Sequence, residues 1–194
     1  MKVGILDYGA GNVQSVQFAL QRLGYSAKLS ANVDELNACD KIIFPGVGHA
    51  KPAMARLRER NLDRFILECN KPLLGICLGM QLLCSHSEEG DTDCVGVFDV
   101  PVKLFNSSEL KIPHVGWNTL HNTNGKIFNS DFENASVYFV HSYFVPENSY
   151  TVATCDYGQK FSAALERDNF FGMQFHPEKS GVAGEKLLGR FLAL

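Results

Sequence analysis

The N-terminal part of the chain alternates strand-like segments with stretches of helical period. Candidate strands span residues 2–6, 26–29, 41–44 and 73–76, and most of them are apolar runs typical of strands covered on both faces. The stretch after the first strand carries apolar residues at helical spacing, namely Val13, Val16, Leu20 and Leu23. Short connections between strands and helices predict an α/β fold with a doubly wound, mostly parallel central sheet and flanking helices.

Other segments complete this expectation. Helical segments are predicted over residues 33–38 and, as one helix, over 54–66, whose apolar stripe ends at Phe65 and Ile66. The polar and acidic stretch 85–93 predicts an exposed loop. A closing helix is predicted around residues 187–192.

From Val95 onward the pattern changes to short β segments separated by turns. We expect these segments to add antiparallel strands to the sheet, at residues 100–105, 117–120, 136–140, 151–155, 161–166 and 170–175. With 194 residues and no linker-like composition, the chain is expected to form a single domain over residues 1–194.

Composition excludes several classes of function. The net charge is −3 and no basic run occurs, so neither nucleic acid nor a membrane is the expected partner. No apolar run approaches the roughly 20 residues of a membrane-spanning helix, and the N-terminus opens into a strand rather than a signal peptide, so we expect a soluble, cytoplasmic protein. The six cysteines form no Cys-x-x-Cys pair and lack histidines at zinc-ligand spacing, so no metal or other cofactor is expected. Gly9-x-Gly11 is not a dinucleotide fingerprint, because Gln14 occupies the third glycine position.

One cysteine occupies a distinctive position. Cys77 follows the predicted strand 73–76, precedes a helical pattern, and has Gly75 and Gly79 on either side of it. Such a tight strand-to-helix turn leaves no room for side chains beside its central residue and exposes that residue's reactive atom. The N–H of Leu78, at the start of the helix, would stabilise a thiolate or an oxyanion. The alternative is an inert buried cysteine, which two glycines at these offsets disfavour.

A nucleophilic thiol needs a base, and the base needs an orienting group. His176 ends an apolar strand, and Pro177 favours extended backbone at the residue before it. In an extended segment Glu178 would point to the same side as His176 and reach its ring. A histidine satisfied by backbone carbonyls is the alternative. Asp7, the loop 45–48 and Cys77 all follow parallel strands and should gather at one sheet edge.

The motifs Gly75-Ile-Cys-Leu-Gly-Met-Gln81 and His176-Pro-Glu178 resemble those of the class I glutamine amidotransferases. The resemblance implies that Cys77 attacks the side-chain amide of L-glutamine and forms a thioester, with His176 as acid and base and Glu178 as its orienting partner. It also implies that Gly46, Val47 and Gly48 lie beside the substrate and supply a second oxyanion donor besides Leu78. Further glutamine contacts are implied for Gln81, His141, Ser142 and Tyr143. An aromatic-rich strand end in a packed core is the other interpretation of residues 141–143.

Further motifs at residues 7–12, 44–49 and 113–118 extend the resemblance over nearly the whole chain. They resemble those of amidotransferase subunits that feed ammonia to a (β/α)8-barrel cyclase of histidine biosynthesis, which implies a functional heterodimer. Asn12 and Trp117 resemble positions that face this partner, although Asn12 could instead cap a helix and a lone tryptophan is often part of the core. Because glycines make the loop 45–48 easy to reorient, we expect low glutaminase activity without the partner.

Three alternatives remain open at this point. A paralogous subunit could feed ammonia to another synthase, for example in amidino-sugar formation. A cysteine hydrolase of related fold would act on peptides or esters without a partner. A non-enzymatic regulatory homologue is disfavoured because Cys77, His176 and Glu178 are all present.

Overall fold

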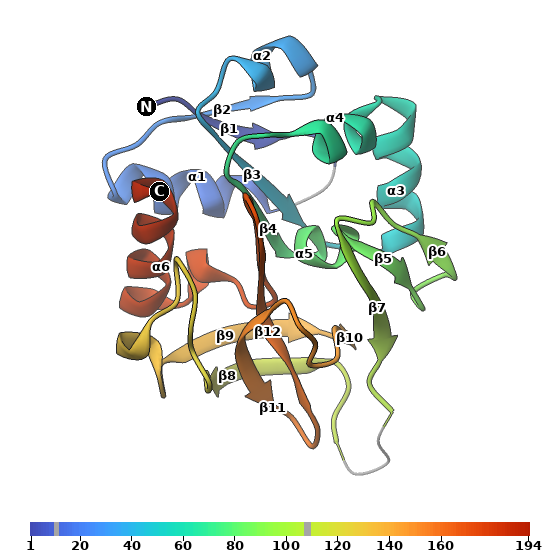
Figure 1. The fold of residues 1–194 in the computed structure, drawn as a ribbon, viewed down its shortest axis with the longest axis vertical. Helices are drawn as coiled ribbons and strands as arrows, with labels where there is room; N and C mark the ends of the chain where they lie inside the picture. Colours follow the sequence, from blue (N-terminus) through green and yellow to red (C-terminus); the bar gives the residue numbers. More distant parts are fainter. Residues whose placement is uncertain (10–11, 107–109) are drawn as a thin grey trace.

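The candidate strands of the N-terminal part form one parallel array (Figure 1). The computed structural model describes residues 1–9, 12–106 and 110–194, so Gly11 of the Gly9-x-Gly11 pattern lies outside the described residues. The parallel strands lie in the order β2, β1, β3, β4. Their bounds are β1 Val3–Leu6, β2 Ala27–Ser30, β3 Lys41–Gly46 and β4 Leu73–Cys77. The prediction of a parallel α/β sheet is confirmed.

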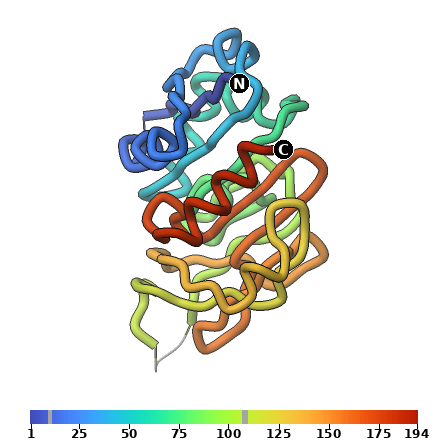
Figure 2. The backbone as a smooth tube through the Cα atoms, turned by 90° about the vertical axis from the view of Figure 1, so that its left-hand side faces the viewer, coloured from blue at the N-terminus to red at the C-terminus, as the bar shows by residue number. Residues whose placement is uncertain are grey.

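Helices cover both faces of this sheet because side chains of a strand alternate between its two sides. Val3 and Ile5 of β1 join a core with α1 and α6, whereas Leu6 joins a second core with α2, α3 and α4. Figure 2 shows α1 and α6 running over one face of the molecule. The helix bounds are α1 Val13–Arg22, α2 Val33–Asn37, α3 Ala50–Glu59, α4 Leu62–Glu68, α5 Leu78–Leu82 and α6 Gly181–Ala193.

The single helix predicted over residues 54–66 is wrong in one respect, because two helices, α3 and α4, occupy this stretch. They are separated at Arg60 and Asn61, and Asn61 adopts a left-handed conformation with φ 56°. Asparagine tolerates that conformation better than most residues. The apolar stripe continues through the break, so periodicity alone does not reveal it.

Part of the C-terminal half completes the large sheet. β13 (Phe170–Met173) pairs in parallel with β4, and β12 (Lys160–Arg167) and β11 (Thr151–Asp156) follow antiparallel. The described residues thus form a seven-stranded sheet in the order β11, β12, β13, β4, β3, β1, β2. Two antiparallel strands are added to the sheet, as predicted, whereas β13 is parallel.

The remaining β segments do not join this sheet, contrary to expectation. β8 (His114–Thr119) and β9 (Ser136–His141) form a separate antiparallel ribbon. Another small sheet has the order β10, β7, β5, β6, and short 3₁₀ turns, η1 and η2, accompany these parts. Their bounds are β5 Cys84–Ser87, β6 Thr92–Asp93, β7 Phe98–Leu104, β10 Tyr143–Phe144, η1 Ser130–Phe132 and η2 Pro177–Lys179.

The stretch 85–93 is also not simply an exposed loop. β5 and β6 pair within it, and only residues between them form a turn. Ser87 is fully buried and Thr92 nearly so, which a polar composition does not suggest. None of the helices in the described part of the chain has the length and apolar character needed to cross a lipid bilayer.

Candidate active site

Cys77 lies at a sharp turn between strand β4 and helix α5. It has φ 53° and ψ −111°, a strained conformation for a residue with a side chain. The two flanking glycines are required sterically. A Cβ atom on Gly79 would lie 1.9 Å from the Phe44 carbonyl oxygen, and one on Gly75 would lie 2.8 Å from backbone atoms of Gly79. The predicted turn with a strained cysteine is therefore present.

The end of strand β3 passes directly beside this turn, so Pro45 and Gly46 of the predicted loop 45–48 belong to the strand. Gly46 is the register partner of Cys77 across the β3–β4 pair. A Cβ atom on Gly46 would lie 2.6 Å from the backbone nitrogen of Gly79, so the end of β3 can pack this closely only without a side chain. Gly48, with φ 103°, has a backbone conformation that favours glycine.

His176 and Glu178 form a buried pair. Nδ1 of His176 lies 2.8 Å from Oε1 of Glu178, and the two residues are 3% and 9% exposed. The contact does not arise from an extended segment, as the sequence suggested, because Glu178 lies in the 3₁₀ turn η2. Burial acts to lower the pKa of His176, but hydrogen bonding and charge from Cys77 and Glu178 prevail and raise it to about 10. The site therefore favours the protonated imidazolium of His176 beside Cys77.

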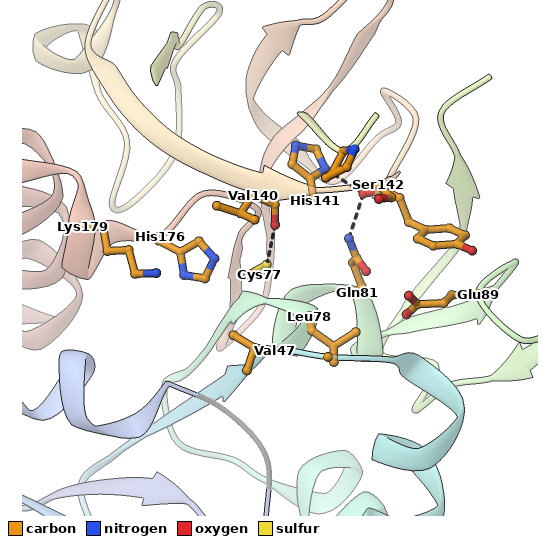
Figure 3. Close-up of a pocket in the computed structure, with 13 residues that line it drawn as sticks. Val47, Cys77, Leu78, Gln81, Glu89, Val140, His141, Ser142, His176 and Lys179 are labelled. Atoms are coloured by element: carbon orange, nitrogen blue, oxygen red, sulfur yellow. Dashed lines mark hydrogen bonds between the residues drawn. The ribbon is translucent and has the colours of Figure 1, made fainter. Parts of the chain in front are cut away.

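These groups meet at a cavity of about 330 Å³ (Figure 3). Most of the predicted site residues line it, namely Val47, Gly48, Cys77, Leu78, Gln81, His141, Ser142, Tyr143 and His176. Gly46 and Glu178 do not line the cavity: Gly46 pairs with Cys77 across the sheet, and Glu178 contacts the His176 ring. Asn12, Trp117 and Asp7 also lie outside the lining.

Sequence reasoning missed Glu89, which lines the cavity with Gln81 and Tyr143. Its Oε2 accepts a hydrogen bond of 2.7 Å from the backbone nitrogen of Ala50, at the start of α3. This contact holds the carboxylate at the cavity. The acidic composition of residues 85–93 was the available signal, but it indicated only solvent exposure. Pro113, Val140 and Lys179 are further lining residues that the sequence did not identify.

Gln174 is a second residue that sequence reasoning missed. It directly follows β13 and is fully buried, and its Nε2 lies 3.8 Å from Sγ of Cys77. Its Oε1 accepts a hydrogen bond of 2.8 Å from Nε2 of Gln81. The sequence pattern predicts position 174 as part of an apolar strand. Because Gln174 and Cys77 are 97 residues apart, no local pattern indicates the contact between them.

His141 uses both ring nitrogens inside the protein. Nδ1 lies 2.7 Å from the carbonyl oxygen of Tyr143, and Nε2 lies 3.0 Å from Nδ1 of His114. Burial lowers the pKa of His141 to about 3 and that of His114 to about 4, so both rings are neutral near pH 7. Phe105, Phe139 and Phe161 surround the His141 ring, which agrees with the packed-core interpretation of that side chain.

The outer side of the β8–β9 ribbon carries exposed apolar side chains. Trp117 is 58% exposed, Val115 is 54% exposed and Val140 is 37% exposed, so the core interpretation of Trp117 is wrong. Asn12 occupies the N-cap position of α1, but its side chain makes no capping hydrogen bond. In the described ranges, with the gaps at 10–11 and 107–109, no cluster of three or more His, Cys, Asp or Glu side chains is arranged for a metal ion.

Comparison with known proteins identifies the family. Residues 4–193 match the family model described as glutamine amidotransferase class-I. The chain therefore belongs to the class-I glutamine amidotransferase family, and it is an enzyme of that class rather than a cysteine hydrolase of another kind.

Curated relatives and solved structures agree with this assignment. The "Imidazole glycerol phosphate synthase subunit HisH" of Bacteroides fragilis strain YCH46 is 52% identical over the full length of both chains. The protein of the same description from Escherichia coli strain K12 is 47% identical, again over both full lengths. The structure of PurLQS from Thermotoga maritima has a TM-score of 0.76 at 22% identity, covering 99% of this chain and 97% of that one, which shows a shared fold.

Proposed function

We propose that this chain is the glutaminase subunit of an imidazole glycerol phosphate synthase and that Cys77, His176 and Glu178 are its catalytic residues. The observation that carries the proposal is the strained Cys77, paired with the buried His176–Glu178 couple at the wall of a cavity. The full-length similarity to HisH subunits supports this synthase over the paralogous alternative of amidino-sugar formation.

The proposed reaction has two halves, formation of a thioester and its hydrolysis. Sγ of Cys77 attacks the side-chain amide carbon of glutamine, and the nitrogen leaves as ammonia after taking a proton from the His176 imidazolium. A thioester remains. His176, now neutral, takes a proton from water, the resulting hydroxide attacks the thioester, and glutamate leaves while the sulfur departs as a thiolate. Glu178 keeps the His176 ring in one orientation throughout.

Each half passes through a tetrahedral oxyanion. As the first residue of α5, Leu78 has an N–H with no acceptor four residues earlier within the helix. An N–H from Gly46, Val47 or Gly48 would act as the second donor, because this loop packs against the start of α5. Two backbone donors at a developing negative charge are the usual means of stabilising such intermediates.

The cavity offers complementary groups for the α-amino and α-carboxylate ends of glutamine. Glu89 provides a carboxylate for the α-ammonium group. Ser142 and Tyr143 are polar residues that also line the cavity, and they would contact the α-carboxylate. Nε2 of Gln81 is already bound to the Tyr143 carbonyl oxygen, at 2.9 Å, and to Gln174, so Gln81 would shape the substrate site by fixing Tyr143.

Ammonia from this site would pass to a partner subunit, the HisF cyclase, in a heterodimer. There it would serve the formation of imidazole glycerol phosphate and AICAR in histidine biosynthesis. The exposed apolar surface of Trp117, Val115 and Val140 supports a docking face on the β8–β9 ribbon. Val140 belongs to this face and also lines the cavity, so the proposed interface lies next to the catalytic site.

The proposal is tested by labelling with a glutamine analogue that carries an electrophilic diazoketone in place of the amide. We expect one label per chain, located on Cys77 by peptide mass spectrometry, with parallel loss of glutamine-dependent synthesis. Ammonia-dependent synthesis by the cyclase should survive both this labelling and the substitution Cys77→Ala. A label on another residue, or glutamine use by Cys77→Ala, would rule out Cys77 as the nucleophile.

A further inference from the structure

Two buried carboxamides connect the cavity wall to the sulfur of Cys77. Gln81 donates from Nε2 to the carbonyl oxygen of Tyr143 and to Oε1 of Gln174. Gln174 in turn donates from Nε2 to Sγ of Cys77. Gln174 is 0% exposed and Gln81 is 4% exposed, so solvent does not compete effectively for these contacts.

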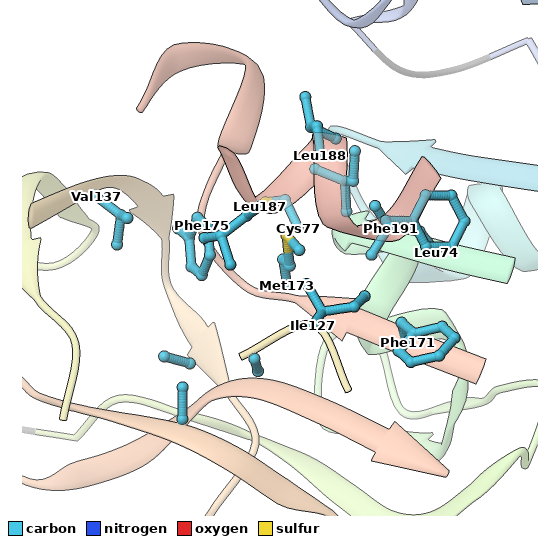
Figure 4. Close-up of a cluster of buried hydrophobic side chains, with 14 of the residues drawn as sticks. Leu74, Cys77, Ile127, Val137, Phe171, Met173, Phe175, Leu187, Leu188 and Phe191 are labelled. Carbon is cyan, nitrogen blue, oxygen red and sulfur yellow. The ribbon is translucent and has the colours of Figure 1, made fainter. Parts of the chain in front are cut away.

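The orientation of the Gln174 carboxamide is determined by its partners. A carbonyl oxygen only accepts, so the Tyr143 contact requires that the NH₂ group of Gln81 points toward Tyr143. The same NH₂ group needs an acceptor on Gln174, which places Oε1 there and turns Nε2 toward the sulfur. Met173 and Phe175, on either side of Gln174, are fully buried in the core beside Cys77 (Figure 4). The backbone of Gln174 is held as well, because its N–H donates to the Ala163 carbonyl oxygen at 2.8 Å.

The sulfur therefore has neighbours that favour different protonation states. The Val140 carbonyl oxygen, 3.7 Å from Sγ, accepts a hydrogen bond from a thiol and repels a thiolate. The Gln174 N–H only donates, so it stabilises the anion more than the neutral thiol. Gln174 is the uncharged donor in this set, and it stays in place while His176 gains and loses its proton.

We propose that Gln174 is a further catalytic residue for glutamine hydrolysis, whose side-chain N–H stabilises the thiolate of Cys77 before attack and again when the thioester breaks. Gln174 transfers no proton, because its amide stays neutral and the proton of Cys77 resides on His176. The inference rests on the proposed function, in which Cys77 is the nucleophile.

The substitution Gln174→Glu separates this role from mere support of Gln81. A carboxylate still accepts the hydrogen bond from Gln81, but it has no N–H for the sulfur and places a negative charge beside it. Gln159→Glu makes the same chemical change at an exposed position in the turn between β11 and β12 and serves as the matched control. Gln174→Leu, which removes donor and acceptor without adding charge, is the second variant if Gln174→Glu does not fold.

The measurement is the rate of Cys77 alkylation by iodoacetamide between pH 5 and 9, made on the full chain with and without the cyclase subunit. For Gln174→Glu we expect alkylation at pH 7 to be slower by about tenfold or more, as for loss of a hydrogen bond to a charged group. The effect should grow with pH as the new carboxyl group ionises. For Gln174→Leu we expect a slowing of about threefold or more and an upward shift of the alkylation midpoint. Gln159→Glu should match the wild type.

Either Gln174 variant, folded by circular dichroism and alkylated with the wild-type pH profile, would overturn the inference. Failure of the proposed function gives a different result. In that case the wild-type chain itself would not be labelled at Cys77 by the glutamine analogue, whatever residue stands at position 174.

Discussion

At the scale of single residues, His176 is the group whose protonation depends most on its neighbours. Burial alone would make its imidazolium unfavourable, yet contacts with Cys77 and Glu178 raise its pKa to about 10. Near pH 7 the ring is therefore protonated, and under the proposed function it can donate a proton to the leaving nitrogen. The carboxylate of Glu178 contacts Nδ1 of the ring and, after Cys77, adds to the rise of its pKa.

Replacement of Glu178 by Gln tests that dependence. The amide keeps a hydrogen bond to Nδ1 but removes the negative charge, so the pKa of His176 should fall and kcat for glutamine should drop by about 10²-fold or more. Steady-state glutamate release over a range of pH measures both effects, with the exposed substitution Glu147→Gln as control. A wild-type kcat in Glu178→Gln would show that Glu178 is not a catalytic residue.

The neutral pair of His114 and His141 makes stability depend on pH. Burial holds both pKa values below the ordinary histidine value of 6.5, so below that pH the unfolded chain binds protons that the folded chain does not. The free energy of unfolding should therefore fall as pH is lowered from about 6.5 toward 4, each histidine contributing at most about 1.4 kcal/mol per pH unit. Urea unfolding of wild type and His114→Gln at several pH values measures this. An equally steep fall in the variant would contradict it.

The sequence predicted those site residues whose chemistry stands in short motifs. Cys77, His176 and Glu178 carry their chemistry in their side chains and lie in short, recognisable motifs. Gln174 and Glu89 carry no such signal, because their importance comes from the positions of Sγ and the cavity, which are created by contacts distant in sequence. The packing of the His141 ring depends likewise on phenylalanines distant in sequence, because Phe105 follows β7 and Phe161 lies in β12.

At the scale of elements, the turn from β4 into α5 determines where the sulfur lies. It depends on close backbone packing between Gly79 and Phe44 of the neighbouring strand β3. Periodicity predicted these strands and the turn because apolar runs and glycines are local signals. It did not predict the break at Asn61 or the β5–β6 pair, because a single backbone dihedral and the burial of Ser87 and Thr92 are set by tertiary contacts.

Gly79→Ala tests the packing at the turn. The added methyl group would meet the Phe44 carbonyl oxygen, so we expect a loss of about 1–3 kcal/mol or more in unfolding free energy, together with loss of glutaminase activity. Gly189→Ala, within α6 and with no atom within 4 Å of the new Cβ, is the matched control. It should be neutral or up to about 1 kcal/mol more stable, since alanine favours helix. Equal stability of the two variants by urea unfolding would refute the packing argument.

At the scale of the whole molecule, the β8–β9 ribbon joins the exposed apolar face to the catalytic groups. The backbone carbonyl oxygen of Tyr138, in β9, accepts a hydrogen bond of 2.9 Å from the backbone nitrogen of His176. The backbone nitrogen of Tyr138 donates to Oγ of Ser180, also at 2.9 Å. Val140, two residues further along, contacts the sulfur through its carbonyl oxygen. A partner that docks on this ribbon would therefore act directly on the position of His176 and Cys77.

Trp117→Ala tests the proposed docking face. Trp117 is exposed and packs edge-on against Tyr138, so its loss should weaken binding of the cyclase subunit by about tenfold or more. Alkylation of Cys77 in the isolated chain should stay unchanged. Leu67→Ala removes a comparably exposed apolar side chain from α4, outside the ribbon, and should bind normally. Calorimetric titration of the cyclase into each variant measures the affinity. An unchanged affinity in Trp117→Ala would show that the β8–β9 ribbon is not the docking face.

The most direct test of the central claim is glutamate release from glutamine by the purified chain, measured alone and with the cyclase subunit and its ligand. The proposed function predicts slow release by the isolated chain, an increase of at least about tenfold in the complex, and none from Cys77→Ala in either condition. Equal turnover alone and in the complex would contradict the coupling to a partner. Glutamate release by Cys77→Ala would contradict the assignment of the nucleophile.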